Sequence, residues 1–154
     1  MKGTYIMLTI VGLGPGPWQQ ITPETKQALD GSRHTYLRTK IHAAVQYLPS
    51  GVRITGFDHL YDELADPERV WQAIVKRVVS LAQKEADIVY AVPGSPLAGE
   101  ATAPAIRGRC RDLGLPVRVI PGISMADTVL PSLGLDLAPA SLQVADAHRP
   151  GIDP

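Results

Sequence analysis

Tyr5–Ile6–Met7–Leu8–Thr9–Ile10–Val11 is a long apolar run that passes directly into Gly12–Leu13–Gly14–Pro15–Gly16. An apolar run of this length is typical of a strand buried on both faces, as in a parallel sheet. The glycines and prolines that follow indicate a loop at the end of that strand. Thr22–Pro23–Glu24 has the residue order of a helix start, and Gly31 that of a helix end. The opening therefore predicts a strand, a glycine-rich loop and a helix.

The same alternation continues along the chain. Further strands are expected at His34–Leu37, Arg53–Phe57, Asp87–Val92 and Val117–Ile120, with a short one at Leu142–Val144. A short helix is expected at Ala43–Leu48. Longer helices are expected after Asp66–Pro67–Glu68, between Ala103 and Leu113, and between Ile123 and Leu133, the last with Ile123, Ala126, Val129 and Leu133 facing inward. Strands alternating with helices predict an α/β fold: a three-layer domain with a mostly parallel sheet flanked by helices.

The length and composition suit one compact domain. The chain has 154 residues, of which 45% are hydrophobic and 19% are charged, and this is enough apolar material for a core. We expect the domain to span residues 1–146. Residues 147–154 are polar and rich in proline and glycine, and are expected to form a tail or a linker.

Charge and cysteine content exclude several classes of protein. The formal net charge is zero, without the basic stripe of a nucleic-acid-binding protein, and the run Arg107–Arg109–Arg111 is interpreted as a solvated helix face. The single cysteine, Cys110, is expected to be a small buried apolar residue, and no spacing predicts a metal site. The start does not resemble a signal peptide and no segment is long enough for a membrane helix, so a cytoplasmic location is expected.

Three loops share an unusual composition. Gly12–Gly16, Pro93–Pro96 and Pro121–Ser124 are all rich in glycine and proline, and each follows a predicted strand. Ligands of open parallel sheets bind outside the carboxyl ends of the strands. The three loops therefore predict either one shared ligand site or three ordinary tight turns, and their composition alone does not separate these alternatives.

The first loop does not fit a nicotinamide dinucleotide. The fingerprint of that class needs a third glycine where this chain has Pro17. It also needs an acid after the second strand to bind the ribose, where this chain has Arg38. An arginine at this place suits the 2′-phosphate of NADP, but the missing third glycine argues against that alternative, so dinucleotide binding is not expected.

Three segments together resemble the tetrapyrrole (corrin/porphyrin) methylase superfamily. They are Val11–Gly16, Tyr90–Leu97 and Val119–Ser124 followed by Ala126, in the order and spacing of that superfamily. Tyr36–Lys40, Phe57–Tyr61 and Glu100 extend the resemblance to the methylase-like domain at the front of MazG-type nucleotide pyrophosphohydrolases. Gly94–Ser95–Pro96 departs from the Gly-Asp-Pro of the uroporphyrinogen and precorrin enzymes, which argues against a corrin substrate.

The resemblance implies S-adenosyl-L-methionine as cofactor and a small molecule as methyl acceptor. It also implies that the cofactor lies between this domain and a second methylase domain that these 154 residues do not contain. The residues that it implies for the cofactor are Pro93, Gly94, Ser95, Pro96, Leu97, Ser124, Met125 and Ala126. Those expected to face the acceptor are Gly12, Gly14, Pro15, Gly16 and Arg38. Arg38 is expected to meet an acidic substrate group or to pair with Glu24 or Asp58, and Ser124 has the alternative role of a helix cap.

No catalytic base is identified from the sequence. The candidate acid or base groups are Asp58, His59, Tyr61, Glu100 and Asp127, although methyl transfer from a sulfonium needs positioning more than proton transfer. We expect a methyltransferase domain; the alternative is a non-catalytic ligand-binding or regulatory domain of a MazG-type pyrophosphohydrolase, with an attached MazG-type domain as partner. An apolar surface left without its second domain is expected to favour a homodimer.

Overall fold

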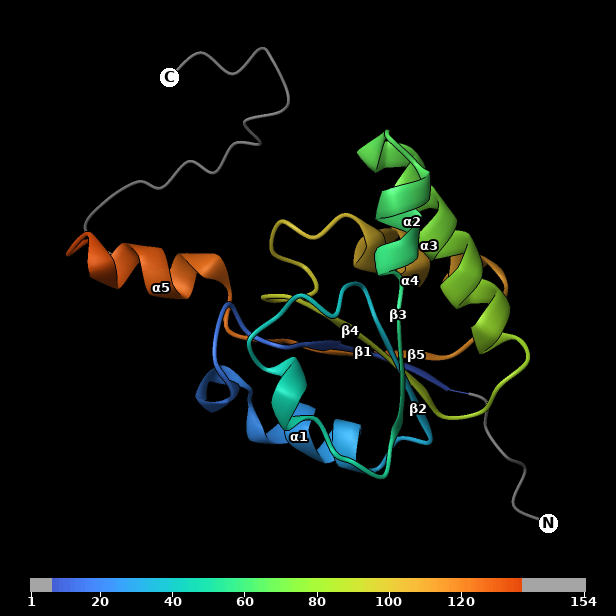
Figure 1. Ribbon diagram of the computed structural model, residues 1–154, viewed down its shortest axis with the longest axis horizontal. Coiled ribbons are helices and arrows are strands. Elements are labelled where there is room, and N and C mark those ends of the chain that lie inside the picture. The colour runs from blue at the N-terminus through green and yellow to red at the C-terminus, as the bar shows by residue number, and fades with distance from the viewer. Residues whose placement is uncertain (1–6, 137–154) are drawn as a thin grey trace.

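The computed structural model describes residues 7–136, which form one five-stranded sheet flanked by helices (Figure 1). All neighbouring strands run parallel, in the order β3-β2-β4-β1-β5. The predicted α/β class is therefore confirmed. The strands are β1 (Leu8–Gly12), β2 (His34–Leu37), β3 (Arg53–Gly56), β4 (Ile88–Val92) and β5 (Val117–Ile120).

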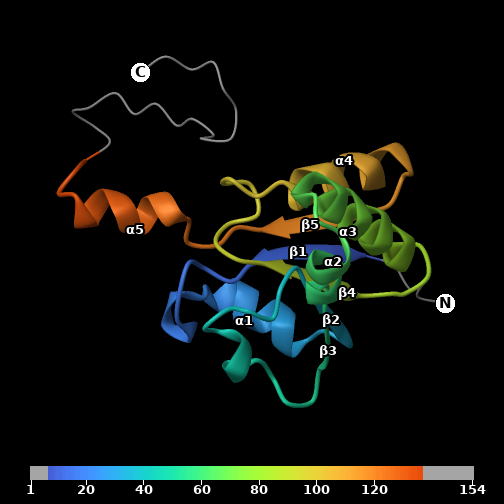
Figure 2. The same cartoon turned by 45° about the horizontal axis from the view of Figure 1, so that its top comes forward.

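Helices cover both faces of the sheet. One face carries α1 (Pro23–Asp30), together with the short 3₁₀ turns Trp18–Gln20 and Val45–Tyr47. The other carries α2 (Asp58–Glu63), α3 (Pro67–Ala82) and α4 (Thr102–Asp112), as Figure 2 shows. Successive side chains of a strand point to opposite faces, so Ile10 packs in the core under α3 and α4 while Val11 packs in the core beside α1.

Local signals in the sequence set the helix starts. The backbone N–H of Thr25 donates to Oγ1 of Thr22 (3.2 Å), and that of Glu68 donates to Oδ1 of Asp66 (3.0 Å). Each cap is followed by a proline in the first turn, where its missing N–H costs no hydrogen bond. The apolar stripe predicted for the longest helix is buried at Val70, Ile74 and Val78.

The strand order creates a crevice at one end of the sheet. β1 and β4 are neighbours, but the chain leaves β1 toward the α1 face and leaves β4 toward the α4 face. Such a switch in direction opens a space between the two loops at the carboxyl ends of the strands. The glycine- and proline-rich loops after β1, β4 and β5 all lie at this end.

The structure corrects two expectations. Residues 43–48 form only a 3₁₀ turn, Val45–Tyr47, and a helix not anticipated from the sequence begins at Asp58. The last helix, α5 (Met125–Ser132), has no buried residue and projects from the body of the domain, so its apolar side chains do not face inward (Figure 1). Its apolar pattern is helical, but no other element within residues 7–136 covers it. The strand expected at 142–144 and the end of the domain at 146 lie outside the described residues.

Candidate functional site at the carboxyl ends of the strands

The loops after β1 and β4 are joined by their backbones. Gly94 donates its N–H to the carbonyl of Gly14 (2.7 Å), and Gly14 donates to the carbonyl of Gly94 (3.1 Å). The N–H of Leu13 donates to the carbonyl of Val92 (2.8 Å). Gly14 and Gly94 adopt φ of +72° and +66°, in the left-handed region that glycine enters without steric cost. Glycine is thus required at both positions for the loops to pair.

The loop after β5 packs against the same pair. A Cβ atom on Gly12 would lie 2.8 Å from the Cα of Gly122, and one on Gly122 would lie 2.9 Å from the Cα of Gly12. Both would also collide with the carbonyl oxygen of Gly94. The N–H of Gly122 points at Oγ of the buried Ser95 (3.4 Å). The three loops therefore form one unit, and the shared site predicted from their composition is favoured over three unrelated turns.

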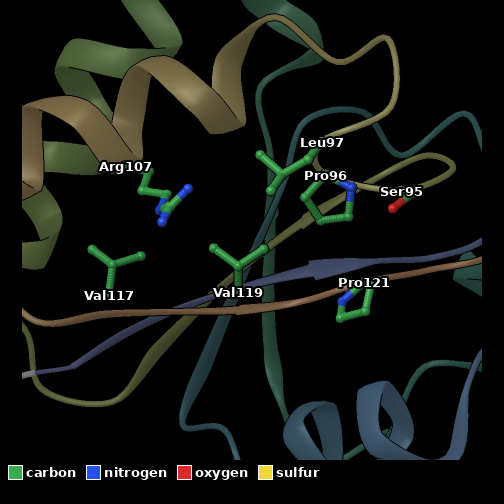
Figure 3. Close-up of a pocket in the computed structure, with 7 residues that line it drawn as sticks. All are labelled: Ser95, Pro96, Leu97, Arg107, Val117, Val119 and Pro121. Carbon is green, nitrogen blue, oxygen red and sulfur yellow. The ribbon is translucent and has the colours of Figure 1, made fainter.

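A pocket of about 390 Å³ lies between the loop after β4, α4 and β5. Figure 3 shows its side chains; Val117 and Val119 of β5 form an apolar wall and Arg107 approaches from α4. Arg107, Arg109 and Arg111 are exposed, so the solvated helix face expected for them is confirmed, and Arg107 also borders this pocket. The lining residues are Ser95, Pro96, Leu97, Arg107, Val117, Val119 and Pro121.

The other residues implied for the cofactor lie around the start of α5. Ser124 and Asp127 form a reciprocal cap: the Ser124 N–H donates to Oδ2 of Asp127 (2.7 Å), and the Asp127 N–H donates to Oγ of Ser124 (3.4 Å). The Ser124 hydroxyl also donates to Oδ2 of Asp127 (2.7 Å), and this hydrogen bond, together with that from the Ser124 N–H, holds the pKa of Asp127 below its usual value. Ser124 therefore caps α5, the alternative role expected for it. The carboxylate of Asp127, one of the candidate acids, is engaged in this cap. Met125 follows with 57% of its surface exposed.

A second pocket, of about 490 Å³, lies on the other side of the β4 loop. It is lined by Arg38, Thr39, Ile41, Asp58, Tyr61, Asp62 and Pro93, and we refer to it as the Arg38 pocket. Pro93 borders this pocket and precedes Gly94, so the Arg38 pocket and the pocket of Figure 3 adjoin opposite ends of one loop.

Arg38 is fixed by a buried carboxylate. Its Nη1 lies 3.1 Å from Oε1 of Glu100, whose side chain is 3% exposed, and its Nε donates to the hydroxyl of Tyr61 (3.1 Å). Burial lowers the pKa of Arg38, but the hydrogen bond to Tyr61 and the charge of Glu100 outweigh it and raise the pKa overall. The pairings with Glu24 and Asp58 considered from the sequence are wrong: Glu24 pairs with Arg118.

Glu100 is held in turn by a chain of hydrogen bonds. Thr102 donates its hydroxyl to both carboxylate oxygens (2.8 and 3.0 Å), and the N–H of Ala103 donates to Oε2. Because Thr102 donates to Glu100, the buried hydroxyl of Tyr90 donates to Thr102 (2.8 Å). Burial and the charge of Glu100 raise the pKa of Tyr90. From the sequence, Glu100 was only a candidate acid or base, since a partner 62 positions away gives no local signal.

Asp58 organises a loop instead. Its carboxylate accepts hydrogen bonds from the Thr39 hydroxyl and from the Lys40 N–H (3.0 Å to both oxygens). Burial raises the pKa of Asp58, but these hydrogen bonds outweigh it and lower the pKa overall. Its neighbour His59, another candidate acid or base, is exposed and lines neither of the two pockets.

Two kinds of site are not found in residues 7–136. No group of three or more histidine, cysteine, aspartate or glutamate side chains could hold a metal ion there. No helix in this described part is long and apolar enough to cross a membrane. Cys110 is buried, as expected.

Fold and site together define a parallel α/β domain in which three glycine-rich loops interlock at the carboxyl ends of the strands. The chain matches the family of Tetrapyrrole (Corrin/Porphyrin) Methylases over residues 7–152, and it belongs to that family. It is 32% identical over 130 residues to the uncharacterized protein YabN of Bacillus subtilis (strain 168).

Solved structures share the fold. Uroporphyrin-III-C-methyltransferase from Thermus thermophilus is 23% identical, with a TM-score of 0.65 over 85% of this chain. Diphthine synthase is 21% identical, with a TM-score of 0.65 over 84% of this chain. The methyltransferase CobJ is 19% identical, with a TM-score of 0.66 over 94% of this chain.

The matched proteins are longer than this chain. The match covers 26% of YabN, 54% of the Thermus methyltransferase, 49% of diphthine synthase and 58% of CobJ. The described domain thus corresponds to about half of each of these solved chains.

Proposed function

We propose that this domain forms one wall of the cofactor site of an S-adenosyl-L-methionine-dependent methyltransferase. The observation that carries the proposal is the convergence of the loops after β1, β4 and β5 through Gly12, Gly94 and Gly122. Family membership and the methyltransferases among the structural relatives support it. In this proposal the methyl acceptor is a small molecule.

The residues of the pocket in Figure 3 fit a sulfonium cofactor. Val117, Val119 and Leu97 offer apolar surface for a nucleoside, and Arg107 is a cation that suits the carboxylate of a methionyl group. The cofactor would be held by Pro93, Gly94, Ser95, Pro96 and Leu97, with Ser124, Met125 and Ala126 across the crevice. The bound cofactor supplies an activated methyl group for in-line displacement, so the protein's task is to orient two reactants and exclude water.

The acceptor would lie beside the loop after β1. We assign to that side Gly12, Gly14, Pro15, Gly16 and Arg38. The Nε2 atom of His42 lies 3.0 Å from the carbonyl oxygen of Gly14, which connects the loop after β1 to the segment that follows Arg38. The Arg38 pocket also adjoins Pro93 in the loop after β4. A second methylase domain would close the crevice from the opposite side. These assignments leave the reaction without a named general base, as expected for a donor that is already activated.

The Leu97→Asp variant tests the cofactor site. We expect the wild-type full-length protein to bind S-adenosylhomocysteine saturably, and Leu97→Asp to raise the dissociation constant about tenfold, because about 1.4 kcal/mol of apolar contact and charge match is lost. Isothermal titration calorimetry measures both. Leu113→Asp is the matched control, since Leu97 and Leu113 are 55% and 53% exposed but Leu113 does not line the pocket.

The methyltransferase proposal would be contradicted if the wild-type protein did not bind S-adenosylhomocysteine, or if it bound NADP more tightly. Binding of the cofactor without methyl transfer to any acceptor would instead favour the regulatory domain of a MazG-type pyrophosphohydrolase.

We also propose that α5 carries a homodimer contact. Met125, Val129 and Leu133 expose 57%, 49% and 65% of their surface on or beside this helix, an apolar face that favours association. The double change Val129→Lys, Leu133→Lys should shift the 154-residue chain from dimer toward monomer in sedimentation velocity. The control is Ile41→Lys, at an exposed apolar residue that does not belong to α5. A wild-type chain that sediments as a monomer at all concentrations would disprove the contact.

A further inference from the structure

The Arg38 pocket presents two hydrogen-bond donors side by side. The hydroxyl oxygen of Tyr61 accepts a hydrogen bond from Nε of Arg38, so the hydroxyl proton of Tyr61 is free to donate elsewhere. The guanidinium also keeps Nη2, which has no hydrogen-bond partner among residues 7–136. Both donors belong to residues that line the pocket. Adjacent donors on an arginine and a tyrosine match the oxygens of an anion.

The carboxylates near these donors are largely occupied. Glu100 is buried and accepts from Thr102 and Ala103 as well as facing Arg38, so it orients the guanidinium without filling the pocket. Asp58 accepts three hydrogen bonds from Thr39 and Lys40. Asp62 also lines the pocket, but it is exposed on α2, where solvent screens its charge.

The remaining walls are apolar. Ile41 is 87% exposed, an unusual state for isoleucine, and it lines the pocket together with Pro93 and the partly exposed ring of Tyr61. A bare inorganic anion would leave this surface uncovered. An apolar body that carries an acidic group would cover it.

We propose that the Arg38 pocket binds a carboxylate carried on an apolar body, with Arg38 and Tyr61 as the recognising donors and Glu100 as the positioning residue. Its assignment to the methyl acceptor rests on the proposed function, whereas the binding chemistry does not. The guanidinium of Arg38 contacts Glu100 through Nη1 and leaves Nη2 for the ligand. The single ammonium group of a lysine cannot make both contacts in this geometry.

Titration of the 154-residue chain with sodium benzoate tests the proposal. NMR of ¹⁵N-labelled protein, observing the arginine Nε–H resonances, should show a saturable shift of the Arg38 resonance and none at Arg118. Tyr61→Phe keeps the ring but removes the donor, and should weaken benzoate binding about fivefold, the value of one hydrogen bond. Arg38→Lys, followed through the backbone amides of residues 38–41, should weaken it at least fivefold. Tyr47→Phe, at an exposed tyrosine outside the pocket, should change nothing.

Two further probes define the chemistry. Benzylamine has the same ring with the opposite charge, and inorganic phosphate has the charge without the ring. If benzylamine bound more tightly than benzoate, the charge of Asp62 would determine which ligands the pocket accepts. If phosphate bound more tightly than benzoate, the apolar walls would contribute nothing to binding. Either result overturns the proposal. Unsaturable shifts, or unchanged affinity in Tyr61→Phe, would also overturn it. The titration needs no cofactor, so its result is independent of whether S-adenosylhomocysteine binds.

Discussion

Replacing Gly122 by alanine should lower the free energy of unfolding by about 3 kcal/mol, the upper end of the usual cost of overpacking. The new Cβ would meet the Cα of Gly12 at 2.9 Å and collide with the carbonyl of Gly94. These are backbone atoms tied into strands and an inter-loop hydrogen bond, so they cannot move aside as a side chain would. Urea denaturation followed by circular dichroism measures the loss.

Gly108→Ala is the control for this effect. Gly108 lies in the middle of α4, and a Cβ there would meet nothing within 4 Å. Alanine is the better helix former by about 1 kcal/mol, so this change should be neutral or stabilising. Because Gly122 joins the loops that form the candidate cofactor site, Gly122→Ala should also weaken binding of S-adenosylhomocysteine. Equal stability of the two variants would show that the loops are not packed as closely as described.

Glu100→Ala is expected to cost about 3 kcal/mol, as does the removal of one member of other buried ion pairs. The change would leave the guanidinium of Arg38 and the hydroxyl of Thr102 without their acceptor. Glu24→Ala is the matched control, since Glu24 pairs with Arg118 at the surface, where both side chains are more than half exposed. That loss should stay below about 1 kcal/mol. Thermal and urea unfolding of both variants measure the difference.

The double variant Arg38→Met, Glu100→Leu separates the cost of an unpaired charge from a general packing defect. Removing both charges should recover at least half of the stability lost in Glu100→Ala, because no buried charge is then left without a partner. A double variant less stable than Glu100→Ala would show that the network around Tyr90 and Thr102, rather than the ion pair, is the main source of stability.

Local patterns predicted most of the elements. His34–Leu37 and Val117–Ile120 are strands with the predicted bounds, and the start of α3 was evident from Asp66 and Pro67. These signals depend on neighbouring residues, whose side-chain periodicity and capping chemistry are encoded within a few positions. The inward orientation expected for the apolar side chains of α5 was wrong: its helical period is real, but no element among residues 7–136 covers its apolar face.

Pairings between distant segments were not accessible in this way. The exposure of Arg107 agrees with the solvated face expected from its helical spacing, but its place beside a pocket depends on the packing of α4 beside β5. Arg38 was expected near an acid, and its partner proved to be Glu100, which reaches it because β2 and β4 are neighbours in the sheet.

Apolar runs, caps and turn residues act locally, so the amino-acid sequence is enough to predict a parallel α/β domain with glycine-rich loops after three strands. The interlocking of those loops at Gly12, Gly94 and Gly122 became visible in the folded domain, as did the position of the Arg38 guanidinium between Glu100 and an open pocket. Both arrangements follow from the strand order. It places β4 between β2 and β1 and thereby brings together groups that lie far apart along the chain.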